Sequence, residues 1–279
     1  MRKFLLAAAA AFFAFPAAGQ APSPPKLLVV IAVDQFSADL YDEYRPDFTG
    51  GLARLSSGTV FHNGYQSHAA TETCPGHSTI LTGDHPARTG IIGNTWFDQS
   101  IGRPDKTVYC AEDESVPGSS SSAYKVSAKH LLVPTLGELM KVVWPDSRTV
   151  AVSGKDRAAV MMSGHKPDQR WYWTGAKFDT DIAPVVVPPV VAKVNALAAA
   201  GLASDRSAFE ATPVCQSRAR EIAVEGGGKP VGAGAFARKA GDQAGFRASP
   251  ELDGDTLALA AALVDSMQLG HRADPDLLA

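Results

Sequence analysis

A threonine stands where a helix is expected to begin, in the segment TETCPGHS at residues 71–78. Pro75 favours the first helical turn, where its missing N–H is not needed, and Thr73 takes the predicted cap position ahead of it. Gly83 predicts the end of this helix. Unpaired backbone N–H groups and the helix dipole would stabilise an alkoxide there and attract a phosphate or sulfate. Taken alone, the pattern favours an ordinary N-cap threonine, so Thr73 becomes a candidate nucleophile only through its companions.

Three other polar residues suit an anionic ligand. Asn94 lies in the glycine-rich segment GIIGNTW, and its amide can donate to an anionic oxygen. Lys155 and Arg157, in the segment SGKDR, follow an expected core strand. A guanidinium binds two oxygens at once and an ammonium acts as a point charge, so the pair suits a dianion. Singly, each residue fits a turn or a solvated loop; together with Thr73 they predict an anion site.

The expected sheet explains how these residues come together. Residues 26–33 form a continuous apolar run, typical of a parallel strand buried on both faces. The run ends at Asp34, a carboxylate at the carboxyl end of a strand, where open α/β sheets bind their ligands. Residues 148–152 predict the next core strand and place Lys155 at the same edge. Helices are expected at residues 48–56, 135–143, 189–202 and 256–269. The pattern predicts a three-layer α/β/α fold with a largely parallel central sheet.

The other segments predict excursions from this sheet. Residues 98–122 are polar and end in a serine run, which indicates a flexible loop, and residues 226–245 indicate an exposed glycine-rich loop. Residues 170–175 predict a hairpin arm outside the sheet, whose aromatic side chains pack in the hairpin or wall a substrate entrance. Residues 276–279 predict entry into another core strand. We therefore expect one domain over 26–279, incomplete at its C-terminus, with excursions at about 98–130 and 165–250.

Composition points to an exported globular protein. Of the 279 residues, 45% are hydrophobic and 20% charged, and the net charge of −3 argues against nucleic acid and against an anionic membrane surface as partners. Residues 1–21 predict a secretory signal peptide, because two basic residues precede an apolar run too short to span a bilayer. No cysteine lies at the expected cleavage site directly after that run, so no lipid anchor is expected there. We expect a periplasmic or secreted monomer without a membrane anchor.

The chain has three cysteines, Cys74, Cys110 and Cys215. They are too few for a disulfide-framed fold. In an oxidising compartment Cys110 and Cys215 can pair and leave Cys74 buried beside Thr73, but all three pairings remain open.

Together these motifs resemble the alkaline phosphatase superfamily, close to bacterial secreted phosphatases with a threonine nucleophile, which are similar to type I phosphodiesterases and nucleotide pyrophosphatases. The resemblance rests on Asp34 after the first strand, TxCPGH, IIGN and SGKDR, and extends from residue 26 to 279. It implies a two-zinc phosphomonoesterase with a phosphothreonine intermediate. Thr73 would attack phosphorus and bind one zinc together with Asp34. Asn94, Lys155 and Arg157 would hold the phosphate oxygens.

The chain departs from this family in its metal ligands. Members carry, further downstream, an Asp-x-x-x-His motif, an Asp-His pair and a final histidine; neither motif follows SGKDR here, and His271 matches no ligand motif. Because a zinc site needs three or four protein ligands, Asp34 and Thr73 cannot fill one. We expect the chain to correspond to the N-terminal part of such an enzyme and to be inactive alone. If it did hold zinc, the histidines first in line as ligands would be His62, His68, His77 and His85.

Other functions remain open. A phosphodiesterase or nucleotide pyrophosphatase shares the zinc and threonine chemistry, but the cations Lys155 and Arg157 favour a dianionic monoester. A sulfatase would carry a cysteine or serine, matured to formylglycine, in place of Thr73. A truncated, non-catalytic anion-binding protein is the third alternative, and a downstream reading frame that encodes the missing ligands would argue against it.

Overall fold

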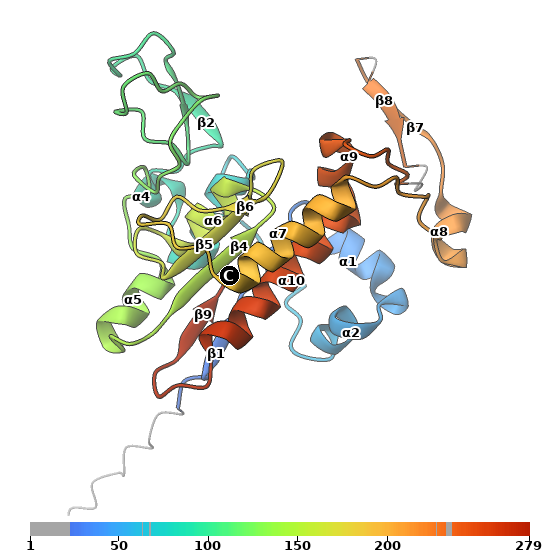
Figure 1. Ribbon diagram of the computed structural model, residues 1–279, viewed down its shortest axis with the longest axis horizontal. Coiled ribbons are helices and arrows are strands. Elements are labelled where there is room, and N and C mark those ends of the chain that lie inside the picture. The colour runs from blue at the N-terminus through green and yellow to red at the C-terminus, as the bar shows by residue number, and fades with distance from the viewer. Residues whose placement is uncertain (1–22, 63, 67, 227, 233–235) are drawn as a thin grey trace, which may run out of the picture.

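The computed structural model describes residues 23–62, 64–66, 68–226, 228–232 and 236–279, so the predicted signal peptide at 1–21 lies outside the described residues. Among these residues one sheet has five strands (Figure 1), in the order β1 (Leu27–Val29), β9 (Asp276–Leu278), β4 (Thr149–Ser153), β5 (Gln169–Trp173) and β6 (Phe178–Asp179). The first four strands run parallel, and β6 pairs with β5 in the antiparallel sense. The predicted, largely parallel sheet is confirmed, and so is the strand expected from residue 276.

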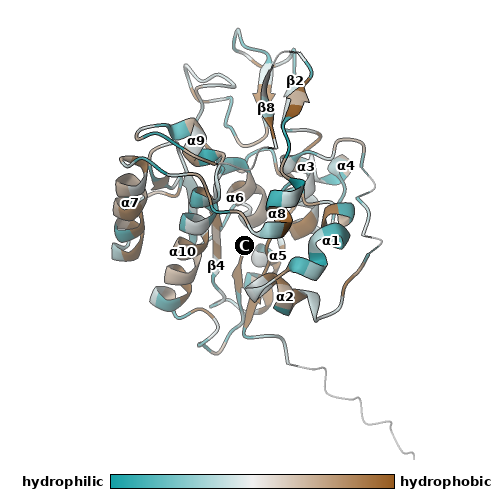
Figure 2. Cartoon of the chain, turned by 90° about the vertical axis from the view of Figure 1, so that its right-hand side faces the viewer, coloured by the Kyte–Doolittle hydropathy of each residue, from teal (hydrophilic) through white to brown (hydrophobic). Residues whose placement is uncertain are grey.

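Helices cover both faces of the sheet. Helices α7 (Pro189–Leu202) and α10 (Pro250–Met267) pack together on one face, and α3 (Thr73–Thr82), α5 (Leu136–Val143) and α6 (Asp156–Ser163) lie on the other. Figure 2 shows β4 between α10 on one side and α5 on the other. Side chains of β5 alternate between these layers, because successive strand residues point to opposite faces. Trp171 and Trp173 join the core under α7 and α10, whereas Tyr172 packs against α6. The three-layer fold is thus confirmed.

The prediction of a hairpin arm outside the sheet at residues 170–175 was right about the hairpin, which β5 forms with β6, and wrong about its position. Residues 170–173 belong to β5, which lies inside the sheet between β4 and β6. Trp171, Tyr172 and Trp173 are only 3%, 6% and 4% exposed. A strand covered by helices on both faces carries large apolar side chains at every position, so it lacks the alternation that marks a half-exposed strand.

The first strand is shorter and more exposed than predicted. β1 ends at Val29. The N–H of Val30 still bonds to the carbonyl of Leu278, and the chain then leaves the sheet. Val29, Ile31 and Val33 are 48%, 59% and 57% exposed. The expectation of burial on both faces was therefore wrong, because β1 lies at the edge of this sheet and pairs only with β9. Asp34 sits on the loop that follows.

Smaller elements surround this frame. Between β1 and α3 lie α1 (Ala38–Tyr44), the 3-10 helix η1 (Arg45–Asp47) and α2 (Gly50–Ser56). After α3 come α4 (Pro86–Thr89) and the hairpin of β2 (Thr95–Phe97) and β3 (Thr107–Tyr109), whose second strand lies inside the segment 98–122 predicted as loop. Another hairpin, β7 (Ile222–Val224) and β8 (Gly228–Val231), lies between α8 (Pro213–Arg218) and α9 (Gln243–Arg247). No helix among the described residues is long and apolar enough to span a membrane.

Fixed polar contacts organise the excursion at residues 98–130. The Arg103 guanidinium makes two hydrogen bonds to the carboxylate of Glu112, which is fully buried. In the serine run, Ser119 accepts a hydrogen bond from Arg103, and Ser121 donates to Asp105. Glu112 also accepts the backbone N–H of Tyr109, at 2.9 Å. These contacts fix the end of β3, which reaches the candidate site.

Candidate active site

The helix that carries Thr73 begins one residue earlier than the sequence suggested. Glu72 is its extended N-cap residue, and the first helical hydrogen bond runs from the N–H of Gly76 to the carbonyl of Glu72, at 3.0 Å. The prediction that Thr73 caps α3 was therefore wrong; Thr73 is the first helical residue. Gly83, with φ of 73°, ends the helix as predicted. Thr73 still lies in the first turn, where backbone N–H groups lack helical partners.

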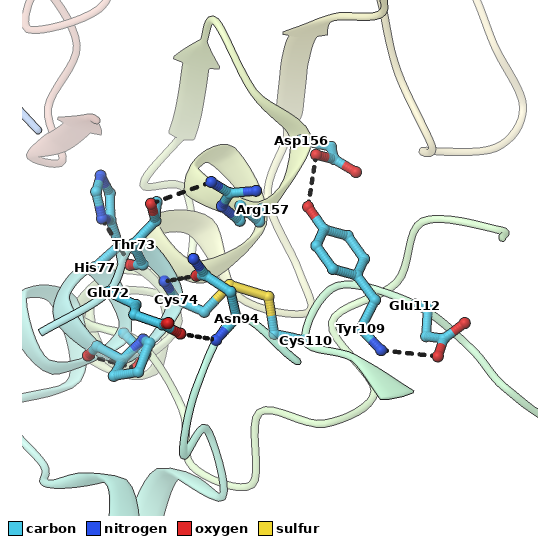
Figure 3. The surroundings of a disulfide bond; sticks show 12 residues. Glu72, Thr73, Cys74, His77, Asn94, Tyr109, Cys110, Glu112, Asp156 and Arg157 are labelled. Atoms are coloured by element: carbon cyan, nitrogen blue, oxygen red, sulfur yellow. Dashed lines mark hydrogen bonds between the residues drawn. A yellow bond between two sulfur atoms is a disulfide. The ribbon is translucent and has the colours of Figure 1, made fainter. Parts of the chain in front are cut away.

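The Thr73 hydroxyl lies between a carboxylate and a cation. Its Oγ1 donates to Oδ2 of Asp34 at 3.2 Å. The same atom accepts from Nη2 of Arg157 at 3.4 Å, as Figure 3 shows. Asp34 lies on the loop after β1, and Arg157 is the second residue of α6. The fold thus brings together three residues that the sequence separates by 39 and 84 positions.

Arg157 has no carboxylate partner among the described residues. Its Nε atom is buried and makes no hydrogen bond. A partly buried guanidinium normally pairs with an acceptor, because desolvation of an unpaired charge is costly. Arg157 is therefore ready to accept an anion beside the Thr73 hydroxyl.

Asn94 reaches the start of α3 from the loop before β2. Its Oδ1 accepts the N–H of Cys74 at 2.9 Å, and its own backbone N–H donates to the Glu72 carboxylate at 2.5 Å. Because the amide oxygen bonds to Cys74, the NH2 group turns the other way, toward Thr73 and Arg157 in Figure 3. The amide donors of Asn94 thus face Thr73 and Arg157.

Lys155 stands next to this group without a hydrogen bond to Thr73, Asp34 or Asn94. It is the N-cap residue of α6. Its Nζ lies 3.1 Å from Oδ1 of Asp156 and 5.9 Å from the centre of the Tyr109 ring, and 36% of its side chain is exposed. The structure therefore places Lys155 at the same helix N-terminus as Arg157 but not in contact with the hydroxyl.

A disulfide ties the Thr73 helix to the β2–β3 hairpin. Cys74 and Cys110 are bonded to each other and fully buried, and Cys215 is exposed and unpaired. The candidate pair Cys110–Cys215 was therefore wrong. The N–H of Cys110 bonds to the carbonyl of Asn94 at 3.0 Å, so the hairpin itself brings Cys110 under the start of α3.

His77 completes the first turn after Thr73. Its Nδ1 donates to the Thr73 carbonyl at 2.8 Å and lies 4.0 Å from Oδ1 of Asp34. Burial lowers the pKa of His77, although Asp34 and the Thr73 carbonyl act in the opposite direction. The ring is therefore neutral near pH 7 and orients the start of the helix. Of the other histidines proposed as reserve ligands, His62 pairs with Asp42 and His68 bonds to the carbonyl of Ala70; His85 is the N-cap residue of α4.

The described residues do not form a complete metal site. No group of three or more histidine, cysteine, aspartate or glutamate side chains gathers among them in a way that could hold an ion. Asp34 and Thr73 lie side by side, as two ligands of one ion would, but zinc needs three or four. The residues present thus match part of a zinc ligand set and do not complete it.

Sequence reasoning missed three residues beside the cations. The Asp156 carboxylate, 4% exposed, accepts the hydroxyls of Tyr109 at 2.9 Å and Tyr124 at 2.7 Å. The place of Asp156 in SGKDR was a usable signal; nothing in the sequence marked the tyrosines. A cavity of about 260 Å³ adjoins them and is lined in part by Lys155, Tyr172, Trp173 and Arg247.

Comparison with known proteins identifies the family and several relatives of this chain. Residues 28–222 match the family described as type I phosphodiesterase / nucleotide pyrophosphatase. The chain is 55% identical over 259 residues to alkaline phosphatase PhoK of Sphingomonas sp and 46% identical over 257 residues to alkaline phosphatase PhoD of Zymomonas mobilis. Each alignment covers 92% of this chain but only 46% and 44% of the relative. The chain therefore spans about half the length of the curated relatives it matches.

Solved structures show the same fold. The crystal structure of wild-type alkaline phosphatase PafA matches with a TM-score of 0.75 and 27% identity, over 93% of this chain and 53% of PafA. A second PafA structure, with a TM-score of 0.74, carries substitutions at a threonine, an asparagine, a lysine and an arginine. In PafA these four positions are separated by 21, 62 and 2 residues.

Proposed function

Because the chain belongs to the type I phosphodiesterase / nucleotide pyrophosphatase family, a family of hydrolases, we propose that it carries the nucleophile and the phosphate-binding residues of a zinc-dependent phosphate monoesterase. The observation that carries this proposal is the Thr73 hydroxyl, held between the Asp34 carboxylate and the unpaired Arg157 guanidinium. A hydroxyl with an acceptor for its proton and a cation beside it suits attack on an anionic phosphorus centre.

Each residue has a distinct part in the proposed reaction. Thr73 Oγ1 forms a bond to phosphorus as its proton passes through Asp34 to solvent. The bond to the leaving oxygen breaks, and the leaving group takes up a proton and departs as an alcohol. Water then hydrolyses the phosphothreonine to inorganic phosphate. Asp34 accepts the hydrogen bond of the hydroxyl and orients it. Arg157, the Asn94 amide and Lys155 bind the non-bridging oxygens, whose charge is spread over the transition state.

Zinc is part of the proposal, although the described residues do not complete its site. In two-metal hydrolases the ions activate the nucleophile and stabilise the leaving oxygen. Asp34 and Thr73 are the residues of this chain that we propose as ligands of one ion. Further ligands would have to join them, so we propose that the 279-residue chain alone is inactive.

Two observations favour a monoester over a diester. Thr73, Asn94, Lys155 and Arg157 are separated by 21, 61 and 2 residues, nearly the spacing of the four substituted positions in PafA, which is named an alkaline phosphatase. A monoester dianion also uses both cations, whereas a diester carries one negative charge. Phosphodiesterase or nucleotide pyrophosphatase activity is the second candidate, because the matched family bears that name.

A chimera tests this proposal. Residues 26–279 would replace the matching part of PhoK, which is 55% identical, so that the rest of PhoK supplies the other half of the enzyme. We expect zinc-dependent hydrolysis of p-nitrophenyl phosphate, with much slower hydrolysis of bis(p-nitrophenyl) phosphate. Thr73→Ala should abolish the monoesterase activity and leave zinc content largely unchanged, while Thr73→Ser retains some activity. Near-normal turnover in Thr73→Ala would reject Thr73, and Thr71 would be tested next.

We also propose that the protein is exported to the periplasm or the medium and acts as a monomer on small phosphate esters. The proposed signal peptide at residues 1–21 supports export. Cell fractionation, N-terminal sequencing of the mature chain and size-exclusion chromatography test these points. An unprocessed cytoplasmic chain would contradict export.

A further inference from the structure

Asp156 separates the two cations of the candidate site and has no role in the chemistry described so far. It is the first residue of α6, between Lys155 and Arg157, and its carboxylate is buried. Oδ1 accepts the Tyr109 hydroxyl and pairs with Nζ of Lys155 at 3.1 Å, and Oδ2 accepts the Tyr124 hydroxyl. Two tyrosine hydroxyls and one ammonium thus hold the two carboxylate oxygens, so the carboxylate has a fixed orientation.

This arrangement restrains Lys155. A lysine side chain ends in three N–H donors on a flexible four-carbon stem, and ordering it costs conformational entropy. Here one donor faces Asp156 and the ammonium lies over the Tyr109 ring. The remaining donors stay available, because 36% of the side chain is exposed. Lys155 is therefore held at the mouth of the site before any anion arrives.

The same contacts connect the cations to the nucleophile. Tyr109 is followed by Cys110, whose disulfide partner Cys74 follows Thr73 (Figure 3). Burial, reinforced by the Asp156 charge, raises the pKa of Tyr109 and of Tyr124, so both hydroxyls remain donors. The start of α3 and the start of α6 are thus joined by one disulfide and one hydrogen bond.

We infer that Asp156, clamped by Tyr109 and Tyr124, is a positioning residue that orders Lys155 for the second negative charge of a phosphate dianion. This inference rests on the proposed function, since it takes Lys155 as a phosphate ligand. Asp156 itself does not touch the anion. A simple charge argument predicts the opposite effect on phosphate affinity. Because a carboxylate near an anion site repels the anion, removal of the Asp156 charge would then tighten phosphate binding. The two accounts can therefore be separated by experiment.

Binding of inorganic phosphate to the purified chain, followed by 31P NMR titration, provides the test. Dimethyl phosphate, a monoanion, is the control ligand, and thermal melting monitors folding. We expect Lys155→Ala to weaken phosphate binding. Asp156→Asn should weaken it roughly tenfold, because the released lysine must be ordered again on each binding event. Dimethyl phosphate binding should change less than about twofold, since it does not require the second charge.

Two further variants sharpen the result. Asp156→Asn in the Lys155→Ala background should cost no additional affinity, because the two residues act as one unit. Tyr124→Phe should weaken phosphate binding in the same direction, even if Asp156→Asn fails to fold, and Asp156→Glu should restore part of the affinity. If the affinity losses of Asp156→Asn and Lys155→Ala add fully in the double variant, Asp156 merely supports the fold. If Asp156→Asn binds phosphate more tightly than the unaltered chain, repulsion between the carboxylate and the anion dominates. Either result overturns the inference.

Failure of the proposed function gives a different pattern. If Lys155→Ala and Arg157→Ala both leave phosphate affinity unchanged, or if the unaltered chain binds no phosphate, the phosphate site itself is wrong and the inference falls with it. If both cation variants weaken binding and Asp156→Asn does not, the phosphate site stands and only the positioning role is rejected.

Discussion

Removal of the Cys74–Cys110 disulfide should cost much of the stability of this chain. The two cysteines are 36 residues apart in sequence, and a cross-link of that length reduces the entropy of the unfolded chain by an amount equivalent to about 4 kcal/mol in the chain-entropy model. Loss of 4 kcal/mol lowers the melting temperature of a domain this size by about 8–16 °C.

Both sulfurs are buried, so the variant has to avoid a new unsatisfied polar group. Cys74→Ala combined with Cys110→Ala removes the link at a small packing cost. Urea unfolding, with and without dithiothreitol, then separates two effects. The reductant should destabilise the unaltered chain by nearly the same amount as the double substitution and should leave the double variant unchanged. Cys215→Ala is the matched control, because Cys215 is exposed and unpaired.

Two results would refute this reasoning. If the reductant leaves the unfolding midpoint of the unaltered chain where it was, the disulfide does not constrain the unfolded state. If Cys215→Ala is destabilised as strongly as the double variant, Cys215 takes part in a cross-link and the pairing is wrong. Peptide mapping without reduction identifies the linked peptides directly.

Three other predictions follow from named contacts. Gly164→Ala should lower the free energy of unfolding in urea by roughly 2–4 kcal/mol, because Gly164 has φ of 68° and a Cβ there would collide with Glu138 and Thr135. Gly83→Ala is the control: Gly83 has φ of 73° but open space around it, so this change should cost only about 1–2 kcal/mol. Equal costs for the two variants would contradict the geometry. The hydrogen bond to Glu138 raises the pKa of His165 above 6.5. Burial raises the pKa of Glu138, but hydrogen bonds from His165 and Thr135 outweigh it and bring that pKa below 4.5. The His165 contribution to stability is therefore full below pH 6.5 and lost as pH rises through its folded pKa, and that of Glu138 is full above pH 4.5 and lost as pH falls through its folded pKa. The melting temperature of His165→Gln should accordingly fall less between pH 6 and pH 9 than that of the unaltered chain, and parallel curves would argue against the pair. In the PhoK chimera, combined replacement of Lys155 and Arg157 by alanine should slow monoester hydrolysis by roughly two to four decades and diester hydrolysis by clearly less; an equal fall on both substrates would mean that the pair supports the fold.

The sequence predicted the frame of the site better than its connections. Asp34, Thr73 and Arg157 could be placed at one sheet edge because each follows a strand or begins a helix, and those positions obey general rules. The helix containing Thr73 was predicted with an error of one residue at its start. Glu72 is the N-cap residue, and its side chain accepts the backbone N–H of Asn94, a contact 22 residues away that no local rule contains.

The errors share a physical cause, which is burial decided by distant parts of the chain. Trp171 and Trp173 have the same local pattern in an exposed hairpin and in a sheet covered on both faces; only the packing of α7 and α10 distinguishes the two. Val29 is apolar enough for a central strand, yet the topology leaves it at an edge. The partner of Cys110 depends on the β2–β3 hairpin, whose strands have only three residues each and are joined by a long polar connection, so no alternating pattern marks them.

The order of strands in the sheet has a consequence for the order of folding. Among the described residues β1 pairs only with β9, whose residues 276–278 lie nearly 250 positions further along the chain. Closing so long a loop is slow, because its entropy is lost before any contact forms. β4, α6 and β5 are consecutive and can pack together through short connections, which gathers the cations early. Asp34 follows β1 and so arrives beside Thr73 last. The anion-binding half of the site therefore forms before the half that carries the carboxylate.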